Sequence, residues 1–402
     1  MIKVMANLFE IRNTVLSYGN SGWCIYIPEL DIPEKGISVL FGKSGSGKTT
    51  LLEALGLMRN TFDYNDNHKE VLEYLFNHVP ELKQNYPENY LNSTSSIKLN
   101  TSESKDESEN GDTHQMFPLF EYDGSGTIRS QEESSIWKRN RSSLLDNILN
   151  GGKESKLDEI RRKYYSFIFQ NTNLMPNFTA AENVALPGMA YGFQDKDNYQ
   201  GCFTPGAHCS HYKDPFKCVA MKKAYTTLKD DLDIRMDQAN KSADELSGGQ
   251  KQRVAFARAF NSNYKVLFGD EPTGNLDYNT ARGLMSALTK KINSETNSHH
   301  ISAILVSHDI ELTKEYADRI VVIKSLPYFI EHSNPKKIYS EHEIVNKIFG
   351  KDDFEALDQS EKEQIFKNYS KKEVGYILPA NVHHRSEETN QFDSSLNLQK
   401  YL

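Results

Sequence analysis

A glycine-rich turn joins a short apolar strand to a helix within residues 36–58, an arrangement that few folds accommodate. The turn reads GKSGSGKT, from Gly42 to Thr49. Its glycines let the backbone pass close to a ligand, and its successive N–H groups with the helix N-terminus form a nest for an anion. Lys48 adds a positive charge, and Thr49 adds a hydroxyl that can bind Mg²⁺. Strand, loop and helix in this order predict a phosphate-binding loop.

Further short apolar runs indicate the sheet to which this loop belongs. Runs of β-branched residues and Leu of this length are typical of strands buried on both faces of a parallel sheet. These runs cover 266–268, 304–306 and 320–323, with helical patterns at 249–260 and 281–292 between them. The alternation predicts an α/β domain.

The composition narrows the choice of compartment and partner. The net charge of −8 disfavours nonspecific binding to nucleic acid, so we expect no direct nucleic-acid contact. No apolar run approaches the roughly 18 residues of a membrane span, and the start, MIKVMANLFEIRN, lacks a secretory signal. Four cysteines in 402 residues do not make a disulfide framework. We therefore expect a protein of the reducing cytosol.

The apolar strand at 266–268 leads to two adjacent carboxylates, Asp270 and Glu271. Alone, such a pair would be an ordinary solvated turn. Beside a phosphate-binding loop, Asp270 is expected to hold the metal, and Glu271 to polarise the water that attacks the terminal phosphate.

The sequence LSGGQ, from Leu246 to Gln250, precedes the helical pattern at 249–260. Ser247 is a favourable helix cap, and two glycines expose the N-terminal amides, so this is a second potential phosphate-binding helix end. One nucleotide cannot occupy two such ends in one chain. We therefore expect the second end to serve the nucleotide of another subunit.

Together these motifs, in the order in which they occur along the chain, resemble the nucleotide-binding subunit of ATP-binding-cassette (ABC) transporters. The resemblance implies an α/β P-loop NTPase, with a mixed parallel sheet core and a helical signature subdomain, that uses ATP and Mg²⁺. The residues it assigns to ATP are Tyr18, Gly42, Lys43, Ser44, Gly45, Ser46, Gly47, Lys48, Thr49 and Thr50, with Ser247, Gly248, Gly249, Gln250 and Asp277. The residues it assigns to catalysis are Lys48, Gln170, Glu271 and His308, and those it assigns to Mg²⁺ are Thr49, Gln170 and Asp270.

Two details of this resemblance go further. Tyr18 matches the aromatic residue that stacks on adenine, although Trp23 or Tyr26 could do the same. The segments EPTGNLD and ENVALP resemble the lipoprotein-releasing, macrolide-exporting and cell-division subfamily. Members of that subfamily act with a separate permease. The resemblance thus implies an ATP-dependent homodimer or heterodimer that energises a permease or mechanotransmission partner from the cytoplasmic face of a membrane.

A soluble ABC ATPase that acts as a nucleotide-dependent regulator is the alternative function. DNA-repair and chromosome-structuring members need long heptad coiled coils, and no sustained heptads lie between the phosphate-binding loop and the LSGGQ motif. Translation-factor members carry two cassettes, whereas this chain has one phosphate-binding loop. Glu271 and His308 are both present, which disfavours a catalytically dead regulator.

The resemblance also predicts a domain organisation. We expect a nucleotide-binding domain over 1–325, with polar insertions at about 60–156 and 192–219, and a partly helical C-terminal extension with a polar tail over 326–402. The core segments of that domain would be 4–58, 157–191 and 220–325. Within the first insertion, the Ser/Glu/Asn-rich tract 92–114 is expected to be a loop or disordered.

The second insertion is rich in potential metal ligands. Cys202, His208, Cys209, His211 and Cys218 lie in or next to it. They lack the paired C-x2-C spacing of zinc sites, so we expect loop cysteines and surface histidines.

Overall fold

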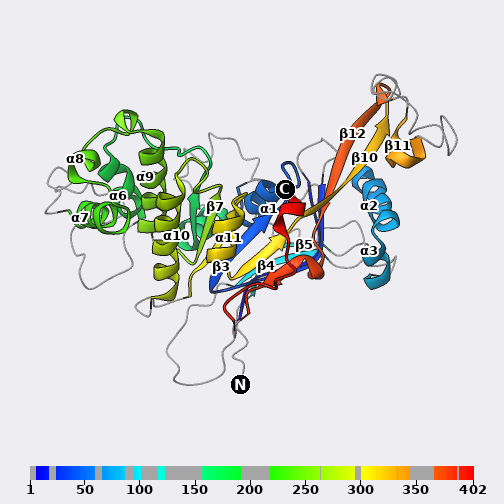
Figure 1. Ribbon diagram of the computed structural model, residues 1–402, viewed down its shortest axis with the longest axis horizontal. Helices are drawn as coiled ribbons and strands as arrows, with labels where there is room; N and C mark the ends of the chain where they lie inside the picture. The colour runs from blue at the N-terminus through cyan, green and yellow to red at the C-terminus, as the bar shows by residue number, and fades with distance from the viewer. Residues whose placement is uncertain are drawn as a thin grey trace, which may run out of the picture.

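A computed structural model describes most of the chain and shows two sheets that share a hydrophobic core, with a helical lobe at one end (Figure 1). The described residues are 6–17, 24–58, 66–86, 95–100, 116–122, 156–191, 218–262, 264–294, 300–332, 334–344, 366–386 and 389–402.

The first sheet has six strands in the order β13-β9-β3-β8-β7-β6. Its strands are β3 (Gly36–Phe41), β6 (Tyr165–Ile168), β7 (Val266–Asp270), β8 (Ser302–Val306), β9 (Arg319–Val322) and β13 (Val382–His384). All the pairings are parallel except that of β13 with β9. Every residue of β3 and β8 is buried, which confirms the parallel sheet that the apolar runs predicted.

Helices follow these strands and also form a separate lobe (Figure 1). Those near the sheet are α1 (Lys48–Leu55), α5 (Lys156–Tyr164), α10 (Tyr278–Asn293) and α11 (Ile310–Tyr316). Those of the lobe are α6 (Ala180–Tyr191), α7 (Val219–Thr226), α8 (Met236–Ala239) and α9 (Gly248–Asn261), with the π-helical turn η3 (Thr227–Asp231). Buried Val184, Leu228 and Phe256 join α6, η3 and α9 in one core. The expected helical subdomain is thus present.

The second sheet has seven strands in the order β11-β10-β12-β2-β1-β4-β5. They are β1 (Asn7–Ser17), β2 (Cys24–Pro33), β4 (Ser95–Asn100), β5 (Met116–Tyr122), β10 (Lys324–Glu331), β11 (Asn334–Tyr339) and β12 (Tyr369–Tyr376). Neighbours are antiparallel except β12 and β2, which are parallel. Strands from the first insertion and from the C-terminal region therefore flank the β1–β2 pair.

The expectation of a loop over 92–114 was wrong at Ser95–Asn100, which forms β4. Only two apolar residues lie in this strand, but Ile97 and Leu99 alternate and pair with Ile11 and Phe9 of β1. Both are fully buried. A small apolar face is sufficient here because β1 supplies the other half of the core and the ladder of hydrogen bonds. The rest of the tract lies outside the described residues.

Two helices of the first insertion, α2 (Asp66–His78) and α3 (Pro80–Asn85), pack on the second sheet (Figure 1). Leu72 and Leu75 of α2 share a buried core with Tyr26, Tyr328 and Val374 of the sheet. The insertion and the C-terminal strands therefore cover each other.

The C-terminal region, expected to be a partly helical extension, enters both sheets through β10, β11, β12 and β13. Its described residues also include helix at 341–344 and the short 3-10 helices η5 (Pro379–Asn381) and η6 (Leu398–Tyr401). The expected polar tail is also packed, because Leu396 and Leu398 are buried in the main core. The composition gives little sign of these contacts, since β10 and β12 each bury only two adjacent residues. Most of the helical spacing at 343–366 lies outside the described residues.

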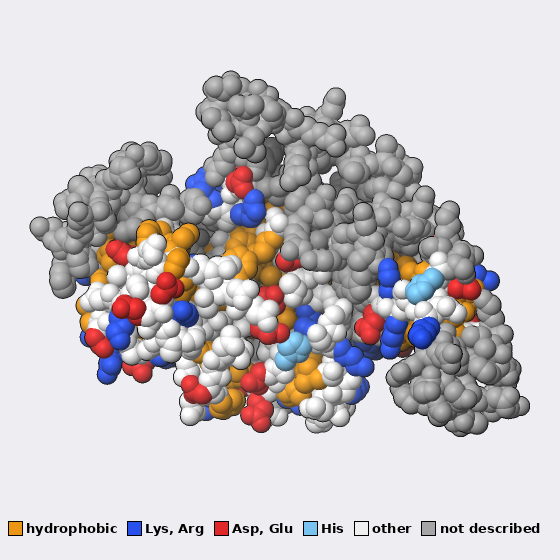
Figure 2. All heavy atoms as spheres, turned by 90° about the horizontal axis from the view of Figure 1, so that it is seen from above, with side chains coloured by type: hydrophobic (Ala, Val, Ile, Leu, Met, Phe, Trp, Pro, Cys, Tyr) orange, Lys and Arg blue, Asp and Glu red, His pale blue; other side chains and the backbone are white. Residues whose placement is uncertain are grey.

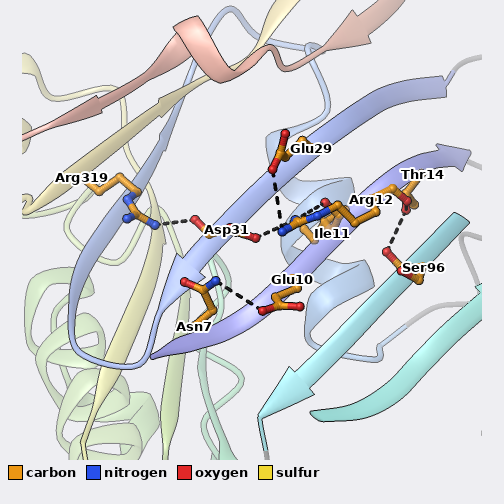
Figure 3. A network of polar contacts seen from close by, with 9 residues as sticks. All are labelled: Asn7, Glu10, Ile11, Arg12, Thr14, Glu29, Asp31, Ser96 and Arg319. Atoms are coloured by element: carbon orange, nitrogen blue, oxygen red, sulfur yellow. Dashed lines mark hydrogen bonds and ion pairs between the residues drawn. The ribbon is translucent and has the colours of Figure 1, made fainter. Parts of the chain in front are cut away.

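A polar network ties the two sheets together (Figure 3). Arg12 of β1 donates to Asp31 of β2 at 2.6 Å and lies 3.8 Å from Glu29. Arg319, at the start of β9, donates to the backbone carbonyl of Asp31. Burial lowers the pKa of Arg319 to about 10, so the side chain stays charged at neutral pH.

The surface shows mixed charge. On the face in Figure 2, acidic and basic side chains of the described residues are interspersed over the helical lobe and the sheets. None of the helices that the structure describes is both long and apolar enough to cross a bilayer.

Candidate functional site

The glycine-rich loop follows β3 and leads into α1, as predicted. Gly45 and Gly47 have φ angles of 78° and 102°, in the left-handed region that favours glycine. Lys48 Nζ donates to the carbonyls of Gly42 at 2.8 Å and Lys43 at 2.7 Å, so the ammonium lies inside the curve of the loop. Burial lowers the pKa of Lys48, while Glu271 and Asp270 oppose that shift.

The other residues of the loop divide between the core and the surface. Ser46, Gly47 and Thr50 are buried, whereas Lys43, Ser44, Gly45 and Thr49 are exposed. Gly42 lies against the end of β9, where a Cβ atom would come within 2.5 Å of the Ile323 carbonyl. The loop is thus fixed at its base and open toward solvent.

Thr49 and Asp270 lie together at the ends of α1 and β7. The Thr49 hydroxyl donates to Asp270 Oδ2 at 3.1 Å and lies 3.4 Å from Oδ1. Burial raises the pKa of Asp270, and the neighbouring Glu271 raises it further. A hydroxyl and a carboxylate side by side are oxygen ligands of the type that Mg²⁺ takes beside substrate phosphates.

Glu271 contacts side chains that follow the two strands on either side of its own strand, β7. His308 follows β8, and its Nε2 lies 3.1 Å from Glu271 Oε1. Gln170 follows β6, and its Nε2 donates to Glu271 Oε2 at 3.2 Å. Glu271 has a φ of 48°, and its N–H donates to the Val306 carbonyl at 3.1 Å. Backbone and side-chain contacts together hold this carboxylate at the C-terminal edge of the sheet.

The motif LSGGQ forms the cap of α9 that the sequence predicted. Gln250 N–H donates to Ser247 Oγ at 3.3 Å, and Ser247 N–H donates to Gln250 Oε1 at 2.9 Å. A Cβ on Gly248 would meet open space, and one on Gly249 would lie 3.5 Å from Leu276 Cδ2. The motif therefore presents a capped, accessible helix N-terminus.

Two residues that the sequence did not single out connect α9 to the site. Gln252 Nε2 is buried and donates to the Pro272 carbonyl at 2.8 Å, one residue after Glu271. Arg258 donates to the Asn173 carbonyl at 2.7 Å, in the segment that follows Gln170. Such contacts from a side chain to a distant carbonyl have no characteristic spacing, so the sequence carried no signal for them.

Asp277 is the N-cap of α10 and is exposed to solvent. Its side chain accepts from Thr280 N–H at 3.0 Å and from Thr280 Oγ1 at 2.7 Å. The Thr280 hydrogen bonds lower the pKa of Asp277. Asp277 lies close in sequence to Glu271, and its assignment to the ATP site stays a prediction.

The aromatic residues proposed for adenine stacking fall into two groups. Tyr18 and Trp23 lie outside the described residues. Tyr26 is fully buried, and its hydroxyl donates to Asn13 Oδ1 at 3.1 Å. Tyr26 is therefore a core residue.

The cysteine-rich insertion lies almost wholly outside the described residues, including Cys202, His208, Cys209 and His211. Cys218 is described, and it is buried at the N-terminus of α7. In the part of the chain that the structure describes, no group of three or more His, Cys, Asp or Glu could hold a metal.

Comparison with known proteins finds similarity to ABC transporter ATP-binding proteins. The family model described as ABC transporter matches residues 125–274, which include Gln170, the LSGGQ motif and Glu271. An uncharacterised ABC transporter ATP-binding protein of Methanocaldococcus jannaschii is 35% identical over 181 residues, 45% of this chain and 66% of that protein. Residues 125–274 are thus similar to the ATP-binding domain of ABC transporters. The phosphate-binding loop precedes the segment that the family model matches, and His308 follows it.

Other relatives of this chain have more specific names. A phosphonates import ATP-binding protein of Oceanobacillus iheyensis is 37% identical, over 46% of this chain and 65% of that protein. A lipoprotein-releasing system ATP-binding protein of Rhodopseudomonas palustris is 32% identical, over 42% of this chain and 61% of that protein. The second name fits the subfamily that the sequence resembles. The chain spans less than two thirds of the length of each of these relatives.

Among solved structures, the chain is similar to a dimeric ATP-binding cassette described as a post-hydrolysis state bound to ADP and Pi. The alignment covers 78% of this chain and 93% of that chain, with 22% identity and a TM-score of 0.46.

Proposed function

We propose that this protein binds ATP with Mg²⁺, dimerises on ATP, hydrolyses it and energises a separate membrane permease or mechanotransmission partner. The observation that carries the ATPase proposal is the position of Glu271, whose carboxylate meets Gln170 and His308. A carboxylate held at the end of a strand beside a phosphate-binding loop is placed to act on an attacking water.

The residues divide the work of phosphoryl transfer. The loop amides and Lys48 bind the β- and γ-phosphates, and Thr49 with Asp270 would hold Mg²⁺, which neutralises charge on the phosphate oxygens. Glu271 takes up the proton of the attacking water, while His308 and Gln170 orient that water and the γ-phosphate. These roles rest on the ABC resemblance and on the contacts described above.

Dimerisation supplies the remaining ligands in this proposal. The capped N-terminus of α9, with Ser247 and Gly249, would face the phosphates bound by a second copy, and Asp277 would lie at the same interface. Because the site is then complete only in the closed dimer, hydrolysis becomes conditional on closure.

The permease contact is proposed for the segment after Gln170. Met175 and Phe178 are 52% and 41% exposed, although both are large apolar residues. Buried Asn183 holds their backbone, because its Nδ2 donates to the carbonyls of both residues at 3.1 and 3.2 Å. A rigid segment with exposed apolar side chains suits a partner surface, and it would place the protein on the cytoplasmic face of a membrane.

The test is a pull-down of tagged Glu271→Gln, with ATP and Mg²⁺, from detergent-solubilised membranes of the source cell. This variant should accumulate in the closed state with any bound permease. Recovery of a multi-span protein supports the transporter proposal. A dimer with no membrane protein, across several detergents, favours the alternative of a soluble nucleotide-dependent regulator.

A further inference from the structure

The C-terminal strand β12 touches the phosphate-binding loop. An ideal Cβ on Gly375 would lie 2.5 Å from the backbone carbonyl oxygen of Ser46 and 3.3 Å from Ile25 Cγ1. Real Cβ atoms essentially never come so close, so the backbone of β12 lies against the loop only because residue 375 is glycine. The φ of Gly375 is outside the left-handed region, so the need for glycine here is one of space.

The two partners in this contact are held in different ways. Gly375 pairs with Ser325 of β10 on one side and with Ile25 of β2 on the other. Ser46 is fully buried, and its Oγ has no hydrogen-bond partner among the described residues. Ser46 N–H donates to the Lys43 carbonyl at 3.2 Å within the loop, and packing against Gly375 and Gly42 limits where this part of the loop can lie.

The same C-terminal region holds the helix that follows His308. Arg385, just after β13, donates to the last carbonyls of α11 and the turn beyond it: Nη2 to Lys314 at 2.7 Å and to Glu315 at 2.9 Å, and Nε to Ala317 at 2.8 Å. A guanidinium at a helix C-terminus satisfies carbonyls that otherwise lack partners, and it complements the helix dipole.

Helix α11 is short and directly linked to His308. It starts at Ile310, and its N-cap Asp309 accepts from Leu312 N–H at 2.8 Å. The helix spans only seven residues, about 10 Å. Arg385 therefore fixes one end of a short rigid element whose other end carries His308.

We propose that residues 369–386 are a positioning element of the ATP site, in which Gly375 sets the phosphate-binding loop through Ser46 and Arg385 sets His308 through α11. This inference rests on the proposed ATPase function. It adds that the region after the last motif fixes the geometry for both nucleotide binding and hydrolysis, through separate contacts.

The two contacts should give different kinetic signatures. Gly375→Ala should displace the loop, because β12 is held by strands on both sides whereas the loop is open to solvent. We expect the Kd of a fluorescent ATP analogue and the KM for ATP to rise about tenfold, with kcat little changed, since a misplacement of about 1 Å can cost up to about 10²-fold. Arg385→Ala should lower kcat by a similar factor, with KM unchanged.

Matched controls exist for both variants. Gly283→Ala lies in α10, where a Cβ meets nothing within 4 Å. Arg235→Ala removes an arginine that is 73% exposed and lies 3.2 Å from Asp237. Both controls should keep the wild-type KM and kcat. Melting temperatures of all variants identify any that fail to fold, and a merely structural role would lower the melting temperature without separating KM from kcat.

Each outcome decides the inference. Wild-type kinetics in a folded Gly375→Ala or Arg385→Ala overturns it for that contact and leaves the ATPase proposal intact. If Gly375→Ala does not fold, the Arg385→Ala kinetics decide, with Arg385→Lys expected to be intermediate because one ammonium cannot reach all three carbonyls. If the wild type hydrolyses no ATP, the ATPase proposal fails, and unchanged analogue affinity in Gly375→Ala then overturns the positioning role separately.

Discussion

His308 Nε2 lies 3.1 Å from Glu271 Oε1, and the two residues follow the neighbouring strands β8 and β7. Gln170, after β6 on the other side of β7, donates to the second oxygen of the same carboxylate at 3.2 Å. Because these strands are parallel, their C-terminal ends meet at one edge of the sheet. Three motifs that are distant in the sequence thus converge on a single carboxylate.

Replacement of Glu271 tests whether that carboxylate is the base. Glu271→Gln keeps the size of the side chain and its contact with Gln170 but removes the charge and the ability to accept a proton. We expect ATP affinity to remain and phosphate release to fall by about 10²–10⁴-fold. Equilibrium binding and phosphate release, with light scattering to detect a stable dimer, provide the measurement. Wild-type turnover in this variant would contradict the assignment.

Lys48→Ala tests the phosphate-binding loop. Hydrogen bonds to a charged group contribute about 1.5–3 kcal/mol, so we expect ATP affinity to fall by about 10–100-fold. The matched control is Lys83→Ala, which removes an exposed lysine of α3 that is far in the sequence from the loop. Titration with a fluorescent ATP analogue measures both variants. The same affinity in Lys48→Ala and Lys83→Ala would remove the phosphate-binding assignment.

The parallel sheet and the position of the site residues were predictable from the sequence because their signals are local. The strand, loop and helix around Gly42, and the carboxylates Asp270 and Glu271 at a strand end, each lie within one short segment. Their convergence then follows from the rule that parallel strands end at the same edge. The sequence also predicted the cap that Ser247 forms on α9.

The C-terminal strands were not predictable in the same way. The segment of β12 reads YSKKEVGY, and only Val374 and Gly375 in it are buried. Its place in the sheet depends on pairing with Cys24 and Ile25, which are distant in the sequence. A strand with so few apolar residues is determined by its neighbours and not by its own pattern.

A buried ion pair gives a prediction about stability. Lys265 Nζ lies 2.9 Å from Glu34 Oε1, with side-chain exposures of 5% and 12%, and it also donates to the Asn100 carbonyl of β4 at 3.1 Å. Glu34→Gln would leave the lysine charge buried without its carboxylate. We expect the free energy of unfolding in urea to fall by about 3–5 kcal/mol.

An exposed pair provides the control for that measurement. Arg235 and Asp237 are 73% and 61% exposed, so Asp237→Asn should change the free energy of unfolding by less than about 1 kcal/mol. Equal effects of Glu34→Gln and Asp237→Asn would mean that burial of the Lys265 pair contributes nothing.

Lys291 of α10 gives a prediction about pH. Its Nζ donates to the Phe260 carbonyl at the end of α9 and lies 4.4 Å from the ring centroids of Phe260 and Tyr264. Burial lowers the pKa of Lys291 to about 7; nearby Lys223 lowers it too, and Asp231 opposes the shift. In the unfolded chain the pKa of a lysine is about 10.4.

The sign of the effect follows from proton binding. Below pH 7 both states hold the proton, whereas between about pH 7 and 10 the unfolded chain holds it and the folded chain does not. The unfolded state then binds more protons, so the free energy of unfolding should rise with pH across this window. Lys291→Met removes this contribution. The free energy of unfolding of the wild type minus that of the variant should therefore rise from pH 7 to pH 9. Urea unfolding at both pH values measures it, with the exposed neighbour Lys290→Met as the control. A difference that stays constant with pH would show that Lys291 keeps its proton in the folded protein.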